Sequence, residues 1–549
     1  MVKKILIFLI IFASSTNKVS ATNYFVSPSG NDANVGSSES APWRTIRKAT
    51  STVVPGDSVY VHNGTYAETV VISKSGTSAG RITFSASPNE NPIIDGSGMT
   101  SIATDGLVQI NDNVNHITFS GFTVKGSPKM GIANRGSNNI VNSNKILLSY
   151  DSAIWHRFGT NTVFRNNEVY YNVRMFTVSA SENGIVCNGS ASWWPATLNS
   201  QNSTGALWEG NYVHNNCGEG IVAHTGDRII GNKFRDNWSI NIYIDNGTGV
   251  LIDRNFVYDT DSVFSVWPGN GRNIPIGIAL ADEQTPCNTF DNTISNNIIV
   301  NARFGVSFYP YTSCSGVINT KIINNSFINS WEYGIRITGS AAANSKSIIA
   351  NNIFSTNRGK SLIIDNLKDF KIQNNLWYSG NTNSAAQFKI GTAVTDLAGF
   401  NAAFPTQISG NIWADPQYSS SLPTDLSQLT PSVFSLKNTS VAIDKGAGSV
   451  AVAADFIGKS RPQGAAIDLG AFEYGGIGAA VPPPSATQLN AVASSPTPTP
   501  KPWTTLTTDY ANWLSYYLQS VRGFAKGDFN ENGKVDGIDY MLWVNNYGK

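Results

Sequence analysis

The chain has 549 residues, a formal net charge of +1, 41% apolar residues and 14% charged residues. This composition is ample for a large core, and it excludes a disordered chain or a strongly basic nucleic-acid-binding protein. Gly and Asn are plentiful, which favours turns over long helices.

The first 21 residues have the pattern of a secretory signal peptide. Two lysines precede a short apolar run from Ile5 to Ala13, and Val19-Ser20-Ala21 provides small residues for cleavage. The run is too short to span a membrane, and no later segment is long and apolar enough. A retained N-terminal anchor is the alternative. We expect a secreted, extracellular or cell-surface protein without a membrane span, whose mature chain starts near Thr22.

Most of the chain is a repeat. An asparagine followed two positions later by an apolar residue recurs, with many gaps of 21 to 28 residues and two of 42 or 44. Self-similarity at this period, in short β-branched runs, predicts a solenoid of strands. The asparagines are Asn144, Asn167, Asn211, Asn232, Asn255, Asn297, Asn325, Asn352, Asn375 and Asn411.

The repeat predicts an all-β fold, a parallel β-helix. Short strands cannot bury an apolar face alone, but coils stacked about 4.8 Å apart let each strand pair with its equivalents. Asparagine tolerates the left-handed backbone at a turn, and stacked amides can hydrogen-bond along the axis. The apolar residues two positions after each asparagine, such as Ile146 and Val169, are expected to form an internal stack.

Two segments resemble a known group of proteins. The opening YFVSPSGNDANVGSSESAPWRTIRKAT and the closing RPQGAAIDLGAFEYG are similar to segments of secreted bacterial right-handed β-helix proteins of the pectin-lyase-like superfamily. The resemblance covers about residues 24–475. It implies an N-terminal cap with the first coils at 22–105 and a β-helix with its end segment at 106–475. The superfamily contains lyases, hydrolases, epimerases and non-catalytic adhesins, so it does not fix the activity.

The last part of the chain is a separate module. Residues 476–504 form a Pro/Ser/Thr-rich linker, which we expect to be extended. Within 505–549, the stretch DFNENGKVDGID at 528–539 has oxygen ligands in the register of a calcium loop, with Gly533 at the sharp turn. A chance acidic loop is the alternative. The predicted Ca2+ ligands are Asp528, Asn530, Asn532, the Lys534 carbonyl, Asp536 and Asp539.

This loop, followed by Tyr-x-x-Trp, resembles half of a type I dockerin. TDYANWLSYY at 508–517 mirrors IDYMLWVNNY at 538–547, but no ligand oxygens in register precede Asp509. We therefore expect a duplicated module with one calcium site. The resemblance implies a cohesin-type scaffold partner, and a different kind of attachment module remains open.

The positions facing outward follow from strand alternation. We align the coils on Ile154, Ile185, Ile221, Ile242, Ile278, Val306 and Ile335, so the residues one and three positions later point outward. The first outward column is Trp155, Val186, Val222, Tyr243, Ala279, Ser307 and Arg336, and the second is Arg157, Asn188, His224, Asp245, Ala281, Tyr309 and Thr338. Aromatic and charged side chains on one face are typical of a sugar-binding groove.

His224 and Asp245 lie in the same outward column of adjacent coils, about 5 Å apart in backbone. A hydrogen bond from the imidazole N–H to this carboxylate would orient the imidazole and raise its basicity. His224 or Tyr243 as base, with Arg157 as carboxylate clamp, would suit β-elimination on a uronate. A surface pair that stabilises two coils is the alternative, and His156 is expected to be a core histidine.

Hydrolysis is the second reaction that these residues allow. It needs two carboxylates, for which Asp245 with Asp282 or Glu219 are the candidates. We find neither clustered aspartates with a downstream lysine nor a paired-aspartate, Gly-His and Arg-x-Lys set. Calcium in the groove is a further expectation. The predicted substrate-binding residues are Trp155, Asn188, Glu182, Tyr309, Arg336, and two from a second outward row, His214 and Arg235.

The four cysteines are compatible with an exported protein. Cys287 and Cys314 follow equivalent strands of neighbouring coils, which predicts a disulfide, whereas the sequence leaves the state of Cys187 and Cys217 open. The leading hypothesis is a monomeric, secreted enzyme that cleaves a polysaccharide, as a lyase or a hydrolase, with epimerisation also open. The rival is a non-catalytic glycan-binding or surface-display protein.

Overall fold

The computed structural model describes residues 21–475, except 189–194, 261–274, 312–313, 339–343, 366, 368, 381–385 and 451. The expected signal peptide, the linker at 476–504 and the dockerin-like module with its calcium loop at 528–539 lie outside the described residues. Within the described part, no helix has both the length and the apolar character needed to cross a membrane.

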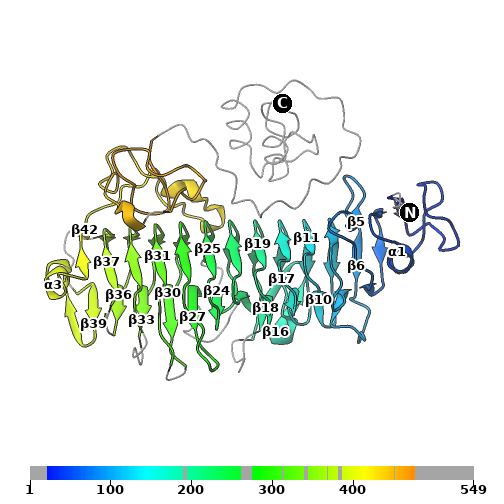
Figure 1. Ribbon diagram of the computed structural model, residues 1–549, viewed down its shortest axis with the longest axis horizontal. Coiled ribbons are helices and arrows are strands. Elements are labelled where there is room, and N and C mark those ends of the chain that lie inside the picture. Colours follow the sequence, from blue (N-terminus) through cyan, green and yellow to red (C-terminus); the bar gives the residue numbers. More distant parts are fainter. Residues whose placement is uncertain are drawn as a thin grey trace, which may run out of the picture.

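Three long sheets, A, B and C, run along the molecule, and a typical coil contributes one strand to each (Figure 1). Nearly all neighbouring strands are parallel, as expected for a β-helix. Sheet A consists of β1 (Asn23–Val26), β2 (Ser58–Val61), β5 (Ile82–Ala86), β8 (Ile117–Ser120), β11 (Ile140–Asn142), β14 (Val163–Arg165), β19 (Leu207–Glu209), β22 (Arg228–Ile230), β25 (Leu251–Asp253), β28 (Thr293–Ser295), β31 (Lys321–Ile323), β34 (Ile348–Ala350), β37 (Lys371–Gln373) and β41 (Ile408–Ser409).

Sheets B and C follow in each coil. Sheet B consists of β3 (Thr65–Tyr66), β6 (Ile93–Asp95), β9 (Thr123–Lys125), β12 (Lys145–Leu147), β15 (Glu168–Tyr170), β20 (Tyr212–His214), β23 (Lys233–Arg235), β26 (Phe256–Tyr258), β29 (Ile298–Val300), β32 (Ser326–Ile328), β35 (Ile353–Ser355), β38 (Leu376–Tyr378) and β42 (Ile412–Trp413). Sheet C consists of β4 (Val70–Ile72), β7 (Gly106–Ile110), β10 (Met130–Asn134), β13 (Ile154–Arg157), β18 (Ala196–Gln201), β21 (Glu219–Ala223), β24 (Ile240–Asp245), β27 (Ile276–Ala281), β30 (Phe304–Tyr309), β33 (Tyr333–Ile337), β36 (Lys360–Ile364), β39 (Phe388–Ile390) and β40 (Ala393–Thr395).

The recurring asparagines form a buried ladder between sheets A and B. The Asn144 amide donates to Asn167 Oδ1 at 3.1 Å, and Asn167 donates to Asn211 Oδ1 at 2.9 Å. The same contact continues to Asn411, so the predicted axial hydrogen bonding is confirmed. The left-handed residue is the one before each ladder asparagine, such as Asn166 (φ 55°), so the prediction placed it one position late.

The residues two positions after the ladder asparagines point into the core, as predicted. Ile146, Val169 and Phe327 are fully buried. The rings of Phe327, Phe354 and Trp377 stack with centroid separations of 4.8 and 4.1 Å.

Both ends of the coil stack are capped. Helix α1 (Ile46–Thr52) packs at the N-terminal end, where the buried Glu68 carboxylate accepts the N–H groups of Ile46 and Arg47. At the other end, helix α3 (Leu397–Ala403) stacks Phe400 on Phe388 at 4.4 Å. Covered ends protect the last strands from pairing with other chains.

An end segment, residues 414–475, turns back and lies along the last coils (Figure 1). Its Leu429, Phe434 and Phe472 cluster with Phe256 and Tyr258 of sheet B. The asparagines that precede the ladder residues hydrogen-bond to the backbone of the end segment. Asn296 donates to Ala454 O, Asn324 donates to Asp468 O, and Asn374 donates to Lys445 O. Asn351 accepts from Ala447 N. The segment contains the short helices η3 (Leu426–Gln428), η4 (Pro431–Phe434) and η5 (Gly448–Val450).

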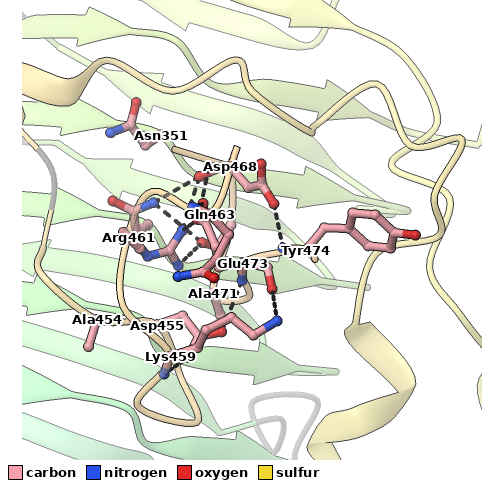
Figure 2. A network of polar contacts seen from close by, with 12 residues as sticks. Asn351, Ala454, Asp455, Lys459, Arg461, Gln463, Asp468, Ala471, Glu473 and Tyr474 are labelled. Atoms are coloured by element: carbon pink, nitrogen blue, oxygen red, sulfur yellow. Dashed lines mark hydrogen bonds and ion pairs between the residues drawn. The ribbon is translucent and has the colours of Figure 1, made fainter. Parts of the chain in front are cut away.

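A buried ion pair fixes the end segment internally (Figure 2). The Arg461 guanidinium donates to Glu473 Oε2 at 2.8 Å, and both side chains are fully buried. Arg461 also donates to the carbonyl of Gly470 and to Asn296 Oδ1 on the β-helix. The predicted end-segment sequence RPQGAAIDLGAFEYG thus supplies both charges of this pair.

One insertion interrupts the coils. After the short helix η1 (Arg174–Phe176), strands β16 (Thr177–Ser181) and β17 (Gly184–Cys187) form an antiparallel hairpin. Ile185 therefore does not belong to sheet C, and Leu198 occupies the predicted position. Cys187 forms a disulfide with Cys217, which the sequence had left open, and the predicted Cys287–Cys314 disulfide is confirmed.

Candidate active site on the outward face of sheet C

The strand register confirms most of the predicted outward columns. Val222, Tyr243 and Ala279 are neighbours on β21, β24 and β27, and the column continues through Ser307 to Arg336. The positions predicted for Val186 and Asn188 belong to Asn199 and Gln201, because the hairpin lies outside the sheet. His156 is fully buried and contacts Asn134, as predicted for a core histidine.

Three carboxyl groups and one phenol gather on this face. We call Glu219, Tyr243, Asp245 and Glu283 the acidic cluster. The Tyr243 hydroxyl donates to Glu283 Oε1 at 2.7 Å, and the Glu283 backbone N–H donates to Asp245 Oδ1 at 3.4 Å. Glu219 is the first residue of β21 and is 3% exposed.

The groups of the acidic cluster influence each other's protonation. Burial, followed by the charges of Glu283 and Asp245, raises the pKa of Glu219 well above its ordinary value. Burial and then Glu283 raise the pKa of Asp245 to about 6. Burial and the bond to Glu283 also raise the pKa of Tyr243. These shifts favour the protonated forms of Glu219 and Tyr243, while Asp245 exchanges its proton near neutral pH.

His224 makes a different contact from the one predicted. Its imidazole hydrogen-bonds to the backbone of Asp245, and burial lowers the pKa of His224 to about 4. The Asp245 carboxylate receives the Glu283 N–H. The His224 backbone N–H donates to Asp227 Oδ2 at 3.1 Å. The expected imidazole–carboxylate bond is replaced by a backbone contact, and a catalytic role of His224 stays a prediction.

Asp282 and Glu283 have different tasks despite their adjacency. Asp282 is 1% exposed, and its Oδ1 accepts the N–H groups of Asn288 and Thr289, both at 2.9 Å. Asp282 therefore holds the loop that follows β27. Glu283, which the sequence analysis missed, is exposed and reaches Tyr243. The sequence feature that could have identified Glu283 is its position just after strand β27, whose side chains line this face.

Trp155 and Arg157 lie at a distance from the acidic cluster. The Arg157 guanidinium is 5.1 Å from the Trp155 ring centroid, and Trp155 donates to Gln201 at 3.2 Å. Arg157 is three coils from Asp245, which corresponds to about 14 Å. It can contact a neighbouring unit of a long substrate but not the bond at Asp245. Trp155 points outward yet is only 7% exposed.

Tyr309 and Arg336 continue the face in the other direction. The Arg336 guanidinium is 5.5 Å from the Tyr309 ring centroid, and it donates to Ser307 Oγ at 3.5 Å. Tyr309 also stacks with Tyr311 at 6.1 Å. An aromatic and cationic surface of this kind is suited to contacts with sugar rings.

The remaining predicted substrate-binding residues lie elsewhere. Glu182 is at the hairpin tip and pairs with Lys125 Nζ at 2.6 Å. The Asn188 backbone N–H donates to Phe176 O at the hairpin base. His214 and Arg235 face outward from sheet B. None of these four residues belongs to the face that carries the acidic cluster.

The part of the chain that the structure describes contains no group of three or more His, Cys, Asp or Glu residues spaced to hold a metal ion. Calcium in the groove stays a prediction.

Family comparisons agree with this architecture. Residues 24–248 match the family model described as Pel9A-like, right handed beta helix region, and residues 191–345 match one described as right handed beta helix region. Both descriptions are of a right-handed β-helix, which agrees with the three stacked parallel sheets of this chain.

A curated protein of Bacillus subtilis is similar over a short region. The chain is 36% identical over 102 residues to the uncharacterized protein YwoF of Bacillus subtilis (strain 168), which is 18% of this chain and 21% of that protein. The chain thus spans about a fifth of the curated relative's length.

Solved structures with similar folds include enzymes and an adhesin. Pectate lyase Pel9A is 17% identical, with 83% of this chain and 98% of that chain covered and a TM-score of 0.45. The GH136 lacto-N-biosidase from Eubacterium ramulus is 13% identical, with 68% of each chain covered and a TM-score of 0.36. PfbA, a surface adhesin of Streptococcus pneumoniae, is 14% identical, with 63% of this chain and 87% of that chain covered and a TM-score of 0.43. These likenesses are of fold alone.

Proposed function

We propose that this protein cleaves a polysaccharide and that hydrolysis of a glycosidic bond takes place at the acidic cluster. The observation that carries the proposal is the convergence of Asp245, Glu283 and Tyr243 on one outward face, beside the buried Glu219. Paired carboxyl groups with different protonation states are the usual requirement of glycoside hydrolysis.

Asp245 is assigned the role of general acid. With a pKa of about 6, its carboxyl group is protonated in a useful fraction of molecules near neutral pH. It gives this proton to the glycosidic oxygen as the bond to the anomeric carbon breaks. Asp245 leaves the step as a carboxylate, and the departing sugar carries a new hydroxyl group.

Glu283 is assigned the role of the second carboxylate. It is exposed, so water and substrate reach it, and the Tyr243 hydroxyl holds one of its oxygens. Glu283 either takes a proton from the attacking water or bonds to the anomeric carbon, and water supplies the final hydroxyl in both cases. Glu219 is a positioning residue, since it is buried and its raised pKa favours the neutral form.

β-Elimination is less well supported by these residues. A base of this reaction must lose its proton, whereas the pKa of Tyr243 is raised. His224 is neutral but bonded to the backbone, and Arg157 is too distant to neutralise a carboxylate at Asp245. The acidic groups would also repel a uronate there.

The activity is tested with the mature protein and a panel of neutral and uronate-containing polysaccharides, with and without calcium. New reducing ends without ultraviolet absorbance of unsaturated uronates would support hydrolysis. A rise of both signals would show a lyase and contradict the assignment to Asp245 and Glu283. No product across the panel would favour the non-catalytic glycan-binding or surface-display role.

We further propose that the protein is secreted and attached through the dockerin-like tail. Calcium titration of the full chain should show tight binding that is lost in Asp539→Ala and kept in Asp509→Ala, the equivalent position of the degenerate half. Calcium-dependent capture by an immobilised cohesin would support a scaffold partner. Calcium binding without capture would favour another attachment partner.

A further inference from the structure

A second cluster of aromatic and basic side chains faces outward from sheet B. In β15, β20 and β23, outward positions align directly: Tyr170 neighbours His214, which neighbours Arg235. In the adjacent outward column, Tyr212 neighbours Lys233. We call Tyr170, Tyr212, His214, Lys233 and Arg235 the basic–aromatic face.

The rings of this face stack on one another, from Tyr170 to His214 along the coil axis and from His214 to Tyr212 along strand β20. Tyr170 and His214 stack at 5.2 Å with nearly parallel planes, and Tyr212 and His214 stack at 4.1 Å. Tyr170 and Tyr212 are both partly exposed. Aromatic rings at a surface can pack against the C–H faces of sugar rings.

Two cations lie beside these rings. The Lys233 ammonium is 4.6 Å from the Tyr212 ring centroid, and the Arg235 guanidinium donates to Asn215 Oδ1 at 2.8 Å. Among the described residues, no carboxylate lies within ion-pair distance of Lys233, whereas Arg235 has Asp236 at 3.5 Å. Burial and then Arg235 lower the pKa of Lys233 to about 8. A bound anion would therefore stabilise the charged form of Lys233.

A second carboxylate near this face, that of Glu168, already has partners. Glu168 Oε2 lies 3.2 Å from Lys145 Nζ, and Glu168 Oε1 lies 3.7 Å from His214 Nε2. The hydrogen bond from His214, and then Lys145, lower the pKa of Glu168 to about 2. Glu168 thus pairs with Lys145 and contacts His214, and among the described residues it is not within ion-pair distance of Lys233.

The basic–aromatic face lies next to the covered part of sheet B. Phe256 and Tyr258, one coil further, pack against the end segment through Leu429 and Phe434. Figure 1 shows the end segment over the coils from β25 onward, and the coils of β11 and β19 beyond its reach. The end segment reaches the edge of the face, where its exposed Asp425 carboxylate interacts electrostatically with Arg235 and leaves Lys233 as the cation further from it.

We propose that the basic–aromatic face is a second glycan site, which binds a uronate unit of an anionic polysaccharide. Lys233 and Arg235 hold the carboxylate, and the stacked rings pack against the sugar. A polymer with apolar ring faces and regularly placed carboxylates complements both features. The site lies on a different sheet from the acidic cluster, and the proposal does not depend on catalysis there.

The test measures binding with calorimetry, at low ionic strength and neutral pH. The protein carries Asp245→Asn so that cleavage does not consume the ligand. The probes are oligogalacturonates and oligomannuronates, with neutral galactan oligosaccharides and polyphosphate as comparisons. We expect at least one uronate oligosaccharide to bind, and the neutral chains and polyphosphate to bind at least tenfold more weakly, which is about 1.4 kcal/mol.

Variants locate the site. Lys233→Gln and Arg235→Gln should each weaken uronate binding about tenfold, because each removes one charge-assisted contact. Lys321→Gln, an exposed lysine on sheet A, is the matched control and should bind as the parent does. Unchanged thermal unfolding would show that the variants fold. Equal binding by the Lys233→Gln and parent proteins, equal affinity for polyphosphate, or no uronate binding at all would overturn the proposal.

Discussion

The Tyr243 hydroxyl on β24 donates a 2.7 Å hydrogen bond to Glu283, which lies in the loop after β27 of the adjacent coil. The repeat predicts that Tyr243 faces outward, whereas Glu283 lies in a loop that the repeat does not describe. Because the pKa of Tyr243 is raised, its hydroxyl remains a donor near neutral pH. Tyr243 therefore holds Glu283 in place without competing for the proton that cleavage requires.

Replacing Asp245 with asparagine should remove the general acid. We expect hydrolysis to fall by about 10²- to 10⁴-fold, the usual contribution of a positioned acid. The measurement is the rate of reducing-end formation on the best substrate from the panel. Asp369→Asn, an exposed aspartate beyond a later strand of the same sheet, is the control and should retain the full rate. A fully active Asp245→Asn protein would contradict the assignment.

The raised pKa of Asp245 also predicts a pH-dependent stability. The folded value of about 6 exceeds the ordinary value of about 3.9, so the folded state binds the proton more tightly between these values. The free energy of unfolding should therefore fall as pH rises through this window. After allowance for partial exposure, the loss is about 1–2 kcal/mol.

Asp245→Asn should abolish this loss. Its melting temperature should exceed that of the wild type by about 1–3 °C at neutral pH and match it near pH 4. Calorimetric scans at both pH values check the difference. A variant that is less stable at neutral pH would show that the carboxylate is compensated in the folded state.

Glu219→Gln distinguishes a buried neutral residue from a proton donor. Because the pKa of Glu219 is raised well above its ordinary value, the amide replaces a protonated carboxyl group of nearly equal size. We expect the rate to stay within about tenfold of the wild type, with the acid limb of the pH profile in place. A loss as large as that of Asp245→Asn would move the acid role to Glu219.

The period of the repeat determined the scaffold and its register. Ile221, Ile242 and Ile278 align as predicted, because a strand inside a β-helix must alternate strictly between core and surface. Ile185 failed this rule although its Gly-Ile-Val sequence equals that of β21. Its strand pairs back on β16 in a hairpin, and the local sequence does not specify which partner a short strand finds.

Loop residues of the site escaped prediction for a related reason. Glu283 lies after β27, where alternation no longer fixes the direction of a side chain. The Asp282 carboxylate accepts hydrogen bonds from backbone N–H groups of this loop and so fixes its course. The Cys287–Cys314 disulfide links the loop to the next coil. Such contacts depend on the stacked coils and not on any period in the sequence.

Docking of the end segment should depend on the Arg461–Glu473 pair. Arg461→Met leaves the fully buried Glu473 carboxylate without its cation, which costs about 3–5 kcal/mol. We expect a lower melting temperature and faster limited proteolysis within residues 414–475, because Asn296 also loses its contact with Arg461. Lys437→Met, at an exposed position of the same segment, is the control and should behave as the wild type does.

A second substitution separates the lost charge balance from lost packing. Replacing both partners, Arg461→Met with Glu473→Leu, removes the uncompensated carboxylate and should recover a large part of the stability. Arg461 also donates to the Gly470 carbonyl, so recovery should be incomplete. If the double variant is as unstable as Arg461→Met, the backbone contacts of Arg461 and not its pairing with Glu473 hold the segment on the coils.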